Sequence, residues 1–156
     1  MSRRLTATTA EQTEACGGRL ARALPANAPG MLQVQLHGDL GAGKTTLARG
    51  FLHALGHTGA VRSPTYTLVE TYALGALTVV HADLYRLQDP DEFESLGLRD
   101  LARADPEWLI EWPERGGNWL PAADVDVTLA AHPTFHSIDL HAATAAGAQW
   151  LARAMG

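Results

Sequence analysis

Residues 38–46 limit what this chain can fold into more than any other stretch. They read Gly-Asp-Leu-Gly-Ala-Gly-Lys-Thr-Thr and contain the G-x-x-x-x-G-K-T pattern of the phosphate-binding loop, or P-loop, of nucleoside triphosphatases. Glycine lets the backbone adopt positive φ angles and approach an anion, so that successive N–H groups surround a phosphate. The Lys44 ammonium would lie between the β- and γ-phosphates, and the Thr45 hydroxyl can bind Mg²⁺. We expect the nucleotide to contact Gly41, Ala42, Gly43, Lys44, Thr45 and Thr46.

The sequence around this loop supports the interpretation. An apolar run at 31–36 precedes the loop and has the character of a buried strand, whereas Leu47, Phe51 and Leu55 recur after it at helical spacing. A strand, the loop and then a helix form the context that the motif requires. Lys44 is also the only lysine of the chain. The single lysine therefore stands where a phosphate-binding ammonium is needed.

The composition narrows the class of protein. With 156 residues, of which 46% are hydrophobic and 19% charged, the chain suits one globular domain, and we expect residues 1–156 to form a single domain. A net charge of -5 argues against a broad nucleic-acid-binding surface. Cys16 is the only cysteine, which excludes an internal disulfide and fits a reducing cytoplasm. No run is apolar and long enough to span a bilayer, so we expect a cytoplasmic protein without a membrane partner.

Strand and helix patterns alternate along the chain, as is typical of an α/β fold. The apolar runs predict strands at 5–9, 31–36, the end of 61–70, 77–83, 106–111, 125–129 and 136–141. The capping and periodic signals predict helices from 9 to 25, through 47–55, after 89–92, at 98–101 and at 144–155, with a loop or short helix at 114–121. The tight connection at Gly75 predicts an antiparallel hairpin.

Two acids stand where the carboxyl ends of strands are expected. Glu111 follows the apolar run 108–110, and Asp83 ends the run 77–82. A P-loop triphosphatase needs a carboxylate near its Mg²⁺ ion, and ligands of α/β folds bind at the carboxyl edge of the sheet. Either acid could instead cap the next helix or pair with an arginine. The sequence leaves open whether Asp83 or Glu111 is the direct metal ligand.

The segment Ser-Pro-Thr at 63–65 follows the phosphate-binding helix. A hydroxyl in such a loop can be ordered by γ-phosphate and Mg²⁺, although an ordinary proline turn has the same composition. Tyr66, Trp112 and Trp119 could stack on a base or a partner, but tryptophan more often fills cores and interfaces. His81 lies in an apolar strand, and we expect a core residue there rather than a catalyst.

Four motifs together identify a family, and they occur in the order 38–46, 63–69, 83–87 and 111–113. After the P-loop they read Ser-Pro-Thr-Tyr-Thr-Leu-Val, Asp-Leu-Tyr-Arg-Leu and Glu-Trp-Pro. In these motifs and their spacing the chain resembles the TsaE family, also called YjeE, the bacterial ATPases of tRNA threonylcarbamoyladenosine biosynthesis. The resemblance covers nearly the whole chain. Many ATPases share the first motif, but the four together are highly specific.

The resemblance implies a single-domain P-loop NTPase fold of the α/β class, with a mixed parallel/antiparallel central sheet flanked by helices, that binds ATP and Mg²⁺. The Mg²⁺ site would fall on Thr45 and Glu111, with Asp83 beside it. Thr65 would lie near the γ-phosphate in a switch-like loop, and Thr13 would lie near the adenine. The catalytic set implied in this way consists of Lys44, Thr65, Asp83 and Glu111.

One segment departs from the family pattern. The family often has a Gly-Arg pair before its last strand, with an arginine near the nucleotide. Residues 132–136 read His-Pro-Thr-Phe-His and contain no arginine. We therefore expect no basic contact from this segment.

The resemblance also implies a role. TsaE proteins act with TsaD and TsaB, which transfer a threonylcarbamoyl group to adenosine at position 37 of tRNAs, and ATP hydrolysis by TsaE is thought to reset the complex. The chain would meet tRNA only indirectly, through this complex. Alone it should hydrolyse ATP slowly, because weak intrinsic activity is typical of a site that a partner completes.

Two other classes of P-loop protein are alternatives to this role. A small-molecule kinase usually needs a mobile lid with several arginines, and Arg99, Arg103 and Arg115 are too scattered to indicate one. A GTPase uses Asn-Lys-x-Asp and Asp-x-x-Gly motifs, and the chain contains neither. The sequence favours an ATPase, with a small-molecule kinase as the main alternative.

Overall fold

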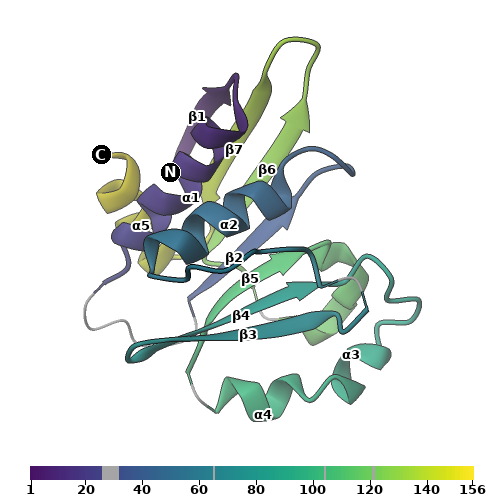
Figure 1. Cartoon of the computed structure of the whole chain (residues 1–156). Coiled ribbons are helices and arrows are strands. Elements are labelled where there is room, and N and C mark those ends of the chain that lie inside the picture. The colour runs from purple at the N-terminus through teal and green to yellow at the C-terminus, as the bar shows by residue number, and fades with distance from the viewer. Residues whose placement is uncertain (26–31, 65, 104, 121) are drawn as a thin grey trace.

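A seven-stranded sheet forms the centre of the computed structural model (Figure 1), which describes residues 1–25, 32–64, 66–103, 105–120 and 122–156. The strands follow the order β1-β7-β6-β2-β5-β4-β3 across the sheet. Their bounds are Ser2–Ala7 for β1, Gln33–His37 for β2, Val69–Leu74 for β3, Leu77–Asp83 for β4, Glu107–Glu111 for β5, Val125–Ala131 for β6 and His136–Ala142 for β7.

The sheet contains both parallel and antiparallel pairs. β2 pairs in parallel with β5 and β6, and β4 pairs in parallel with β5. The pairs β1–β7, β6–β7 and β3–β4 are antiparallel. Because β2, β5 and β4 are parallel neighbours, their carboxyl ends meet at one edge, where Glu111 lies opposite both Leu36 and Asp83. The predicted mixed α/β sheet is confirmed.

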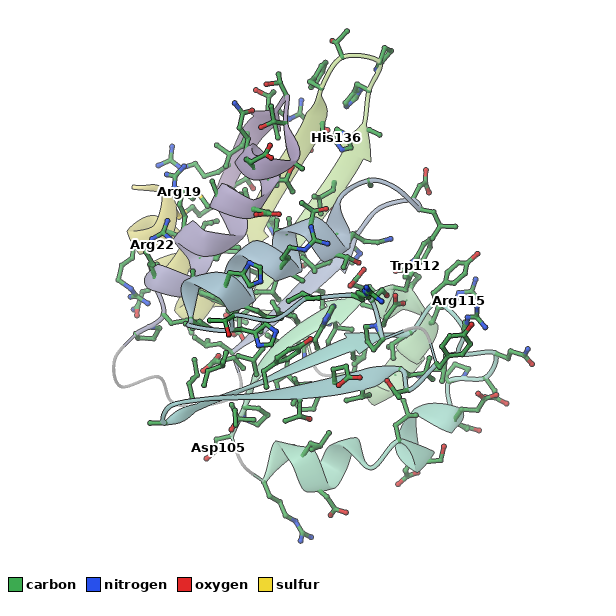
Figure 2. All side chains as sticks on the ribbon, in the orientation of Figure 1. Arg19, Arg22, Asp105, Trp112, Arg115 and His136 are labelled. Atoms are coloured by element: carbon green, nitrogen blue, oxygen red, sulfur yellow. The ribbon has the colours of Figure 1, made fainter. Side chains whose placement is uncertain are left out.

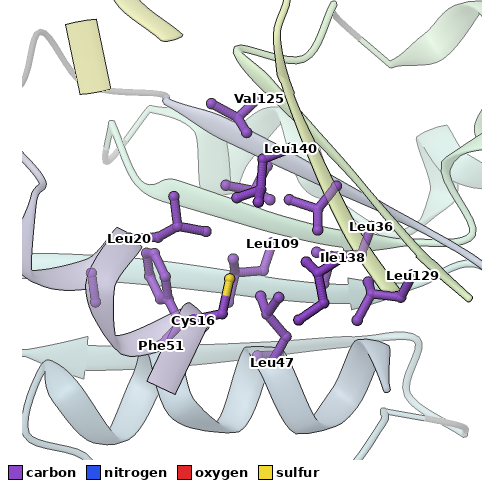
Figure 3. Close-up of a cluster of buried hydrophobic side chains, with 14 of the residues drawn as sticks. Cys16, Leu20, Leu36, Leu47, Phe51, Leu109, Val125, Leu129, Ile138 and Leu140 are labelled. Carbon is purple, nitrogen blue, oxygen red and sulfur yellow. The ribbon is translucent and has the colours of Figure 1, made fainter. Parts of the chain in front are cut away.

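Three helices cover one face of this sheet: α1 (Ala10–Arg22), α2 (Lys44–Ala54) and α5 (Ala145–Met155) (Figure 1). Their apolar sides and this face form the larger buried cluster, in which Leu20, Phe51 and Leu109 are fully buried (Figure 3). Burial of such side chains contributes roughly 1.5–3 kcal/mol each. This cluster holds the P-loop helix against the sheet.

Glycines bring α1 and α2 into close contact. A Cβ atom on Gly17 would lie 2.1 Å from the Leu47 carbonyl oxygen, and one on Gly50 would lie 1.9 Å from the Glu14 carbonyl oxygen. These distances are shorter than any non-bonded contact, so a larger residue at either position would force the helices apart. The same close approach keeps the amino end of α1 beside the P-loop.

Shorter helices lie on the other side of the sheet: α3 (Glu92–Ser95), α4 (Leu98–Ala102) and the 3₁₀-helix η1 (Pro113–Trp119). Figure 1 shows α3 and α4 beyond β3 and β4. The smaller buried cluster on this side includes Val80, Trp108 and Ile110. Side chains alternate along a strand, so His81 and Asp83 of β4 point to the α2 side instead.

Most predicted elements are confirmed, although several ends differ. The edge strand begins at Ser2 rather than at residue 5, because β7 continues as its antiparallel partner to the Ser2–His141 pair. Helix α1 ends at Arg22 rather than near Pro25. The hairpin at Gly75 is present, with a φ of 67° at the glycine. In the described part of the chain, no helix combines the length and the hydrophobicity needed to cross a membrane.

Candidate functional site

The P-loop connects the carboxyl end of β2 to the amino end of α2. Its glycines have φ angles of 144° at Gly38, 81° at Gly41 and 111° at Gly43, as the sequence predicts. Helix α2 begins directly after Gly43, and no described side chain caps its first turn. Uncapped N–H groups and the positive end of the helix dipole suit the binding of an anion.

Lys44 is buried beside the loop, with 5% of its surface exposed. Its Nζ donates a hydrogen bond to the Gly38 carbonyl and lies 3.7 Å from the centroid of the Trp112 ring, in cation–π geometry. Burial lowers the pKa of the ammonium from its ordinary value, and the nearby Glu111 and Asp83 carboxylates oppose this shift. The only lysine is therefore held between the loop, two acids and an aromatic ring.

Trp112 was predicted only as an aromatic residue that could stack on a base or a partner. Its φ of 55° lies in the left-handed region, which is costly for a bulky residue. Its ring centroid is 4.9 Å from that of Tyr85, and the Arg115 guanidinium lies 5.8 Å from the Tyr85 centroid. Figure 2 shows Trp112 and Arg115 at the same end of the molecule. The strained backbone turns the Trp112 ring towards Lys44.

Glu111 contacts the first turn of α2. The Thr45 Oγ1 lies 3.1 Å and 3.2 Å from the two carboxylate oxygens and donates to them. The Glu111 Oε2 also lies 2.6 Å from the Nε2 of the buried His81. Glu111 is itself buried, with 2% of its surface exposed. The structure therefore brings together Thr45 and Glu111, which are far apart in the sequence.

Asp83 lies beside Glu111 but has different partners. Its Oδ2 accepts a hydrogen bond from the Ser63 hydroxyl, and its Oδ1 accepts one from the Tyr85 backbone N–H at 2.9 Å. The carboxylate thus connects the segment at 63–64 to the turn after β4. Thr65, predicted to lie near the γ-phosphate, falls outside the described residues.

One cavity of about 230 Å³ collects most of the predicted residues. It is lined by the whole loop from 40 to 46 together with Ser63, Asp83 and Glu111. Two acids face this cavity, and Lys44 provides the cation. Such a mixture of backbone N–H groups, an ammonium and carboxylates is suited to a phosphate chain together with a divalent cation.

A second cavity of about 170 Å³ adjoins the first at Gly41, Gly43 and Thr46. Thr13 and His136 also line it. A Cβ on Gly43 would lie 3.5 Å from the Thr13 Cγ2 and 3.9 Å from the His136 Nδ1, so both side chains closely surround the loop. Thr13 therefore lies next to the P-loop, and its place near the adenine stays a prediction.

Sequence reasoning missed His136. Its Nδ1 lies 2.9 Å from the Ala42 carbonyl oxygen, so the first residue of β7 contacts the P-loop backbone. Figure 2 shows that its side chain comes from the β7 strand, away from Trp112. The only available signal was its position in the segment where the family often has an arginine.

The oxygen donors of the first cavity fit a Mg²⁺ ion. The Thr45 hydroxyl and the Glu111 carboxylate lie within 3.2 Å of each other and provide the ligand type that Mg²⁺ prefers. Within the described ranges, no group of three or more His, Cys, Asp or Glu residues could hold a metal ion. Mg²⁺ usually binds one or two carboxylates together with waters and substrate phosphates. The donors therefore fit Mg²⁺ that is bound jointly with a nucleotide.

The loop, the buried acid and their place at the carboxyl edge of parallel strands define a protein of the P-loop NTPase type. The family model described as "Threonylcarbamoyl adenosine biosynthesis protein TsaE" matches residues 7–138. The chain belongs to the TsaE family, whose role is in tRNA threonylcarbamoyladenosine biosynthesis.

Relatives and a solved structure agree with this assignment. The chain is 50% identical over 116 residues to the Haemophilus influenzae tRNA threonylcarbamoyladenosine biosynthesis protein TsaE, covering 74% of this chain and 73% of that protein. It is 40% identical over 94 residues to the Bacillus subtilis protein of the same name, covering 60% and 58%. The crystal structure of Bacillus subtilis YdiB matches with a TM-score of 0.80 at 26% identity, over 99% of this chain and 94% of that chain.

Proposed function

We propose that this chain is a Mg²⁺-dependent ATPase of a single domain that assists TsaD and TsaB in forming threonylcarbamoyladenosine on tRNA. Its hydrolysis of ATP resets the complex, and it meets tRNA only through that complex. The observation that carries the proposal is the hydrogen bond from Thr45 to Glu111 inside the P-loop cavity. A hydroxyl at the start of the P-loop helix and a strand-end acid are the protein's share of a Mg²⁺–nucleotide site.

Each residue of the site has a role in this proposal. The backbone N–H groups of 41–46 bind the phosphates, and Lys44 neutralises the charge that develops on the γ-phosphate. Thr45 and Glu111 hold Mg²⁺, with Asp83 beside them. When bound, Mg²⁺ would offset the negative charge of the phosphates. Through Asp83 and its own Thr65, the segment at 63–65 responds to whether the bound nucleotide carries a γ-phosphate.

The second cavity is assigned to the nucleoside. It opens beside the loop at Gly43 and is bordered by Thr13 of α1 and His136 of β7. The imidazole of His136 provides a flat ring and a polar atom at the place where the family often uses an arginine. Proximity to the P-loop, rather than any base-specific contact, supports this assignment.

ATP turnover tests the proposal. The purified protein should hydrolyse ATP slowly with Mg²⁺, and added TsaD and TsaB should accelerate hydrolysis. Lys44→Ala should abolish turnover, because the ammonium is the only described cation lining the P-loop cavity. Normal turnover by Lys44→Ala would contradict the role of the P-loop. An unchanged rate with TsaD and TsaB, together with phosphate transfer to a small molecule, would favour a kinase.

A further inference from the structure

His81 is a buried histidine that the proposed function does not use. It lies in β4 with 0% of its surface exposed, and it pairs with Leu109 of the neighbouring β5. Two residues later on the same strand and the same face comes Asp83. The side chain therefore lies in the layer between the sheet and α2, behind the P-loop cavity.

The two nitrogen atoms of the His81 ring have different surroundings. The Nε2 lies 2.6 Å from the Glu111 Oε2, and both side chains are buried. The Nδ1 is buried too, and it has no hydrogen-bond partner among the described residues. An ionised carboxylate only accepts hydrogen bonds, so next to ionised Glu111 the Nε2–H is the donor. A proton on Nδ1 as well would leave a buried donor unsatisfied.

Glu111 is consequently held from two sides. Thr45 donates to it from the start of α2, and His81 donates to it from β4. A hydrogen bond to a buried carboxylate is roughly twice as strong as one between neutral groups. A freely rotating carboxylate would have to be ordered each time a cation binds, whereas this one is already fixed in direction.

We propose that His81 is a positioning residue of the ATPase site. Its Nε2–H fixes the rotamer of Glu111, so that the carboxylate faces Thr45 and the cavity before the nucleotide and Mg²⁺ arrive. His81 itself touches neither. This role rests on the proposed function, because it presumes that Glu111 holds Mg²⁺. It agrees with the expectation that His81 is a core residue rather than a catalyst, and adds a role for that residue.

Three variants separate positioning from packing. His81→Leu removes the donor, and His81→Gln can return an amide N–H close to the position of the Nε2. Val79→Ala is the matched control, because Val79 is buried on the same strand and face but has no polar side chain. All three are checked for folding by circular dichroism and thermal unfolding before use.

The first measurement is the Mg²⁺ concentration that gives half-maximal ATP turnover. We expect His81→Leu to raise it by about 10–100-fold, the usual effect of losing a group that orients a metal ligand. His81→Gln should recover most of the loss, and Val79→Ala should leave the value unchanged even though it lowers the melting temperature. ATP affinity in EDTA should be equal in the native protein and His81→Leu.

The second measurement does not depend on activity. Nitrogen-15 NMR of the histidine rings in the full native chain should show His81 with its proton on Nε2 and a bare Nδ1. A proton on Nδ1 alone would overturn the proposal, since Nε2 could not then donate to Glu111. An unchanged Mg²⁺ requirement in a folded His81→Leu would overturn it as well. If the native protein hydrolyses no ATP, the proposed function fails instead, and the NMR result still reports on His81.

Discussion

Strand β5 begins and ends with a buried glutamate, and the two differ in what surrounds them. Glu107 and Glu111 are each 2% exposed and point to the same face of the sheet. Glu111 has Thr45 and His81 as hydrogen-bond partners. Glu107 leaves its Oε2 without a partner among the described residues. Burial raises the pKa of Glu107 to about 7, with a smaller contribution from the negative charge of Asp124.

Glu107 and Glu111 are equally buried, so burial is not what distinguishes the acid that is proposed to bind the cation. At the Glu111 end, the P-loop follows β2 and Asp83 ends β4, so that both line one cavity with Glu111 of β5. The Glu107 end is the amino edge of the same parallel strands, where α/β folds do not usually place their ligands. Glu111 has side-chain donors and faces a cavity, so it can bind a cation, whereas burial of Glu107 favours its neutral form despite a backbone hydrogen bond near Leu32.

The largest expected difference between the two acids is in turnover. Glu111→Gln should lower ATP hydrolysis by at least about a hundredfold, because it removes the carboxylate charge that is proposed to hold Mg²⁺ at the phosphates. Glu107→Gln, which makes the same change at the other end of the strand, should stay within about twofold of the native rate. Steady-state hydrolysis by the two variants measures this. Equal losses would mean that the ends of β5 do not differ as proposed.

The second difference is in stability and depends on pH. The folded pKa of Glu107, about 7, lies above the ordinary value of 4.5, so its contribution to stability is fully present below 4.5 and is lost as pH rises through 7. Between acidic pH and about pH 8, the native protein should therefore lose roughly 3 kcal/mol more of its free energy of unfolding than Glu107→Gln loses.

Urea unfolding at about pH 5 and about pH 8 checks this expectation. The gap between the native protein and Glu107→Gln should widen as pH rises. A gap that stays constant would show that Glu107 does not titrate in this range in the folded protein.

The third difference concerns the tryptophan that follows each acid. Trp112 follows Glu111 and lies over Lys44, whereas Trp108 follows Glu107 and packs into the smaller cluster. In a variant that keeps only Trp112, fluorescence should change when ATP binds, because the Lys44 ammonium under the ring would then contact phosphate. A variant that keeps only Trp108 should not respond. Equal responses would point to a general conformational change instead.

The smallest expected effect concerns the backbone on either side of β5. Asp105 precedes the strand with a φ of 47°, and Trp112 follows it with a φ of 55°. Asp105→Gly should change the free energy of unfolding by less than about 1 kcal/mol, since aspartate tolerates this region and glycine prefers it. Its ATP turnover should equal that of the native protein. A larger loss in urea unfolding would indicate a contact of the Asp105 side chain that matters.

The sequence predicted what local rules control. The P-loop, its positive φ angles and the acids at strand ends follow from motif, glycine content and apolar pattern. The contact between Thr45 and Glu111 could be expected, because parallel strands end at one edge. The family resemblance implied that Thr13 lies near the adenine, and the structure shows only that it lies beside the P-loop.

Other features depend on contacts that no local pattern reveals. The register of β4 against β5 pairs His81 with Leu109, two residues before Glu111. The hydrogen bond between His81 and Glu111 is therefore a diagonal contact between the strands, and the sequence alone does not reveal it. The contact of His136 with the loop depends on where β7 begins. Trp112 reaches Lys44 through a backbone conformation that its residue type disfavours. Register and strain are tertiary properties, and a single sequence does not report them.

The most direct test of the central claim is the effect of Mg²⁺ on ATP affinity. Calorimetric titration of ATP with Mg²⁺ or with EDTA would compare the native protein, Glu111→Gln and Glu107→Gln. Mg²⁺ should tighten binding by at least about tenfold in the native protein and in Glu107→Gln, and should lose most of this effect in Glu111→Gln. Equal tightening by Mg²⁺ in all three proteins would contradict the assignment of Glu111 to the cation.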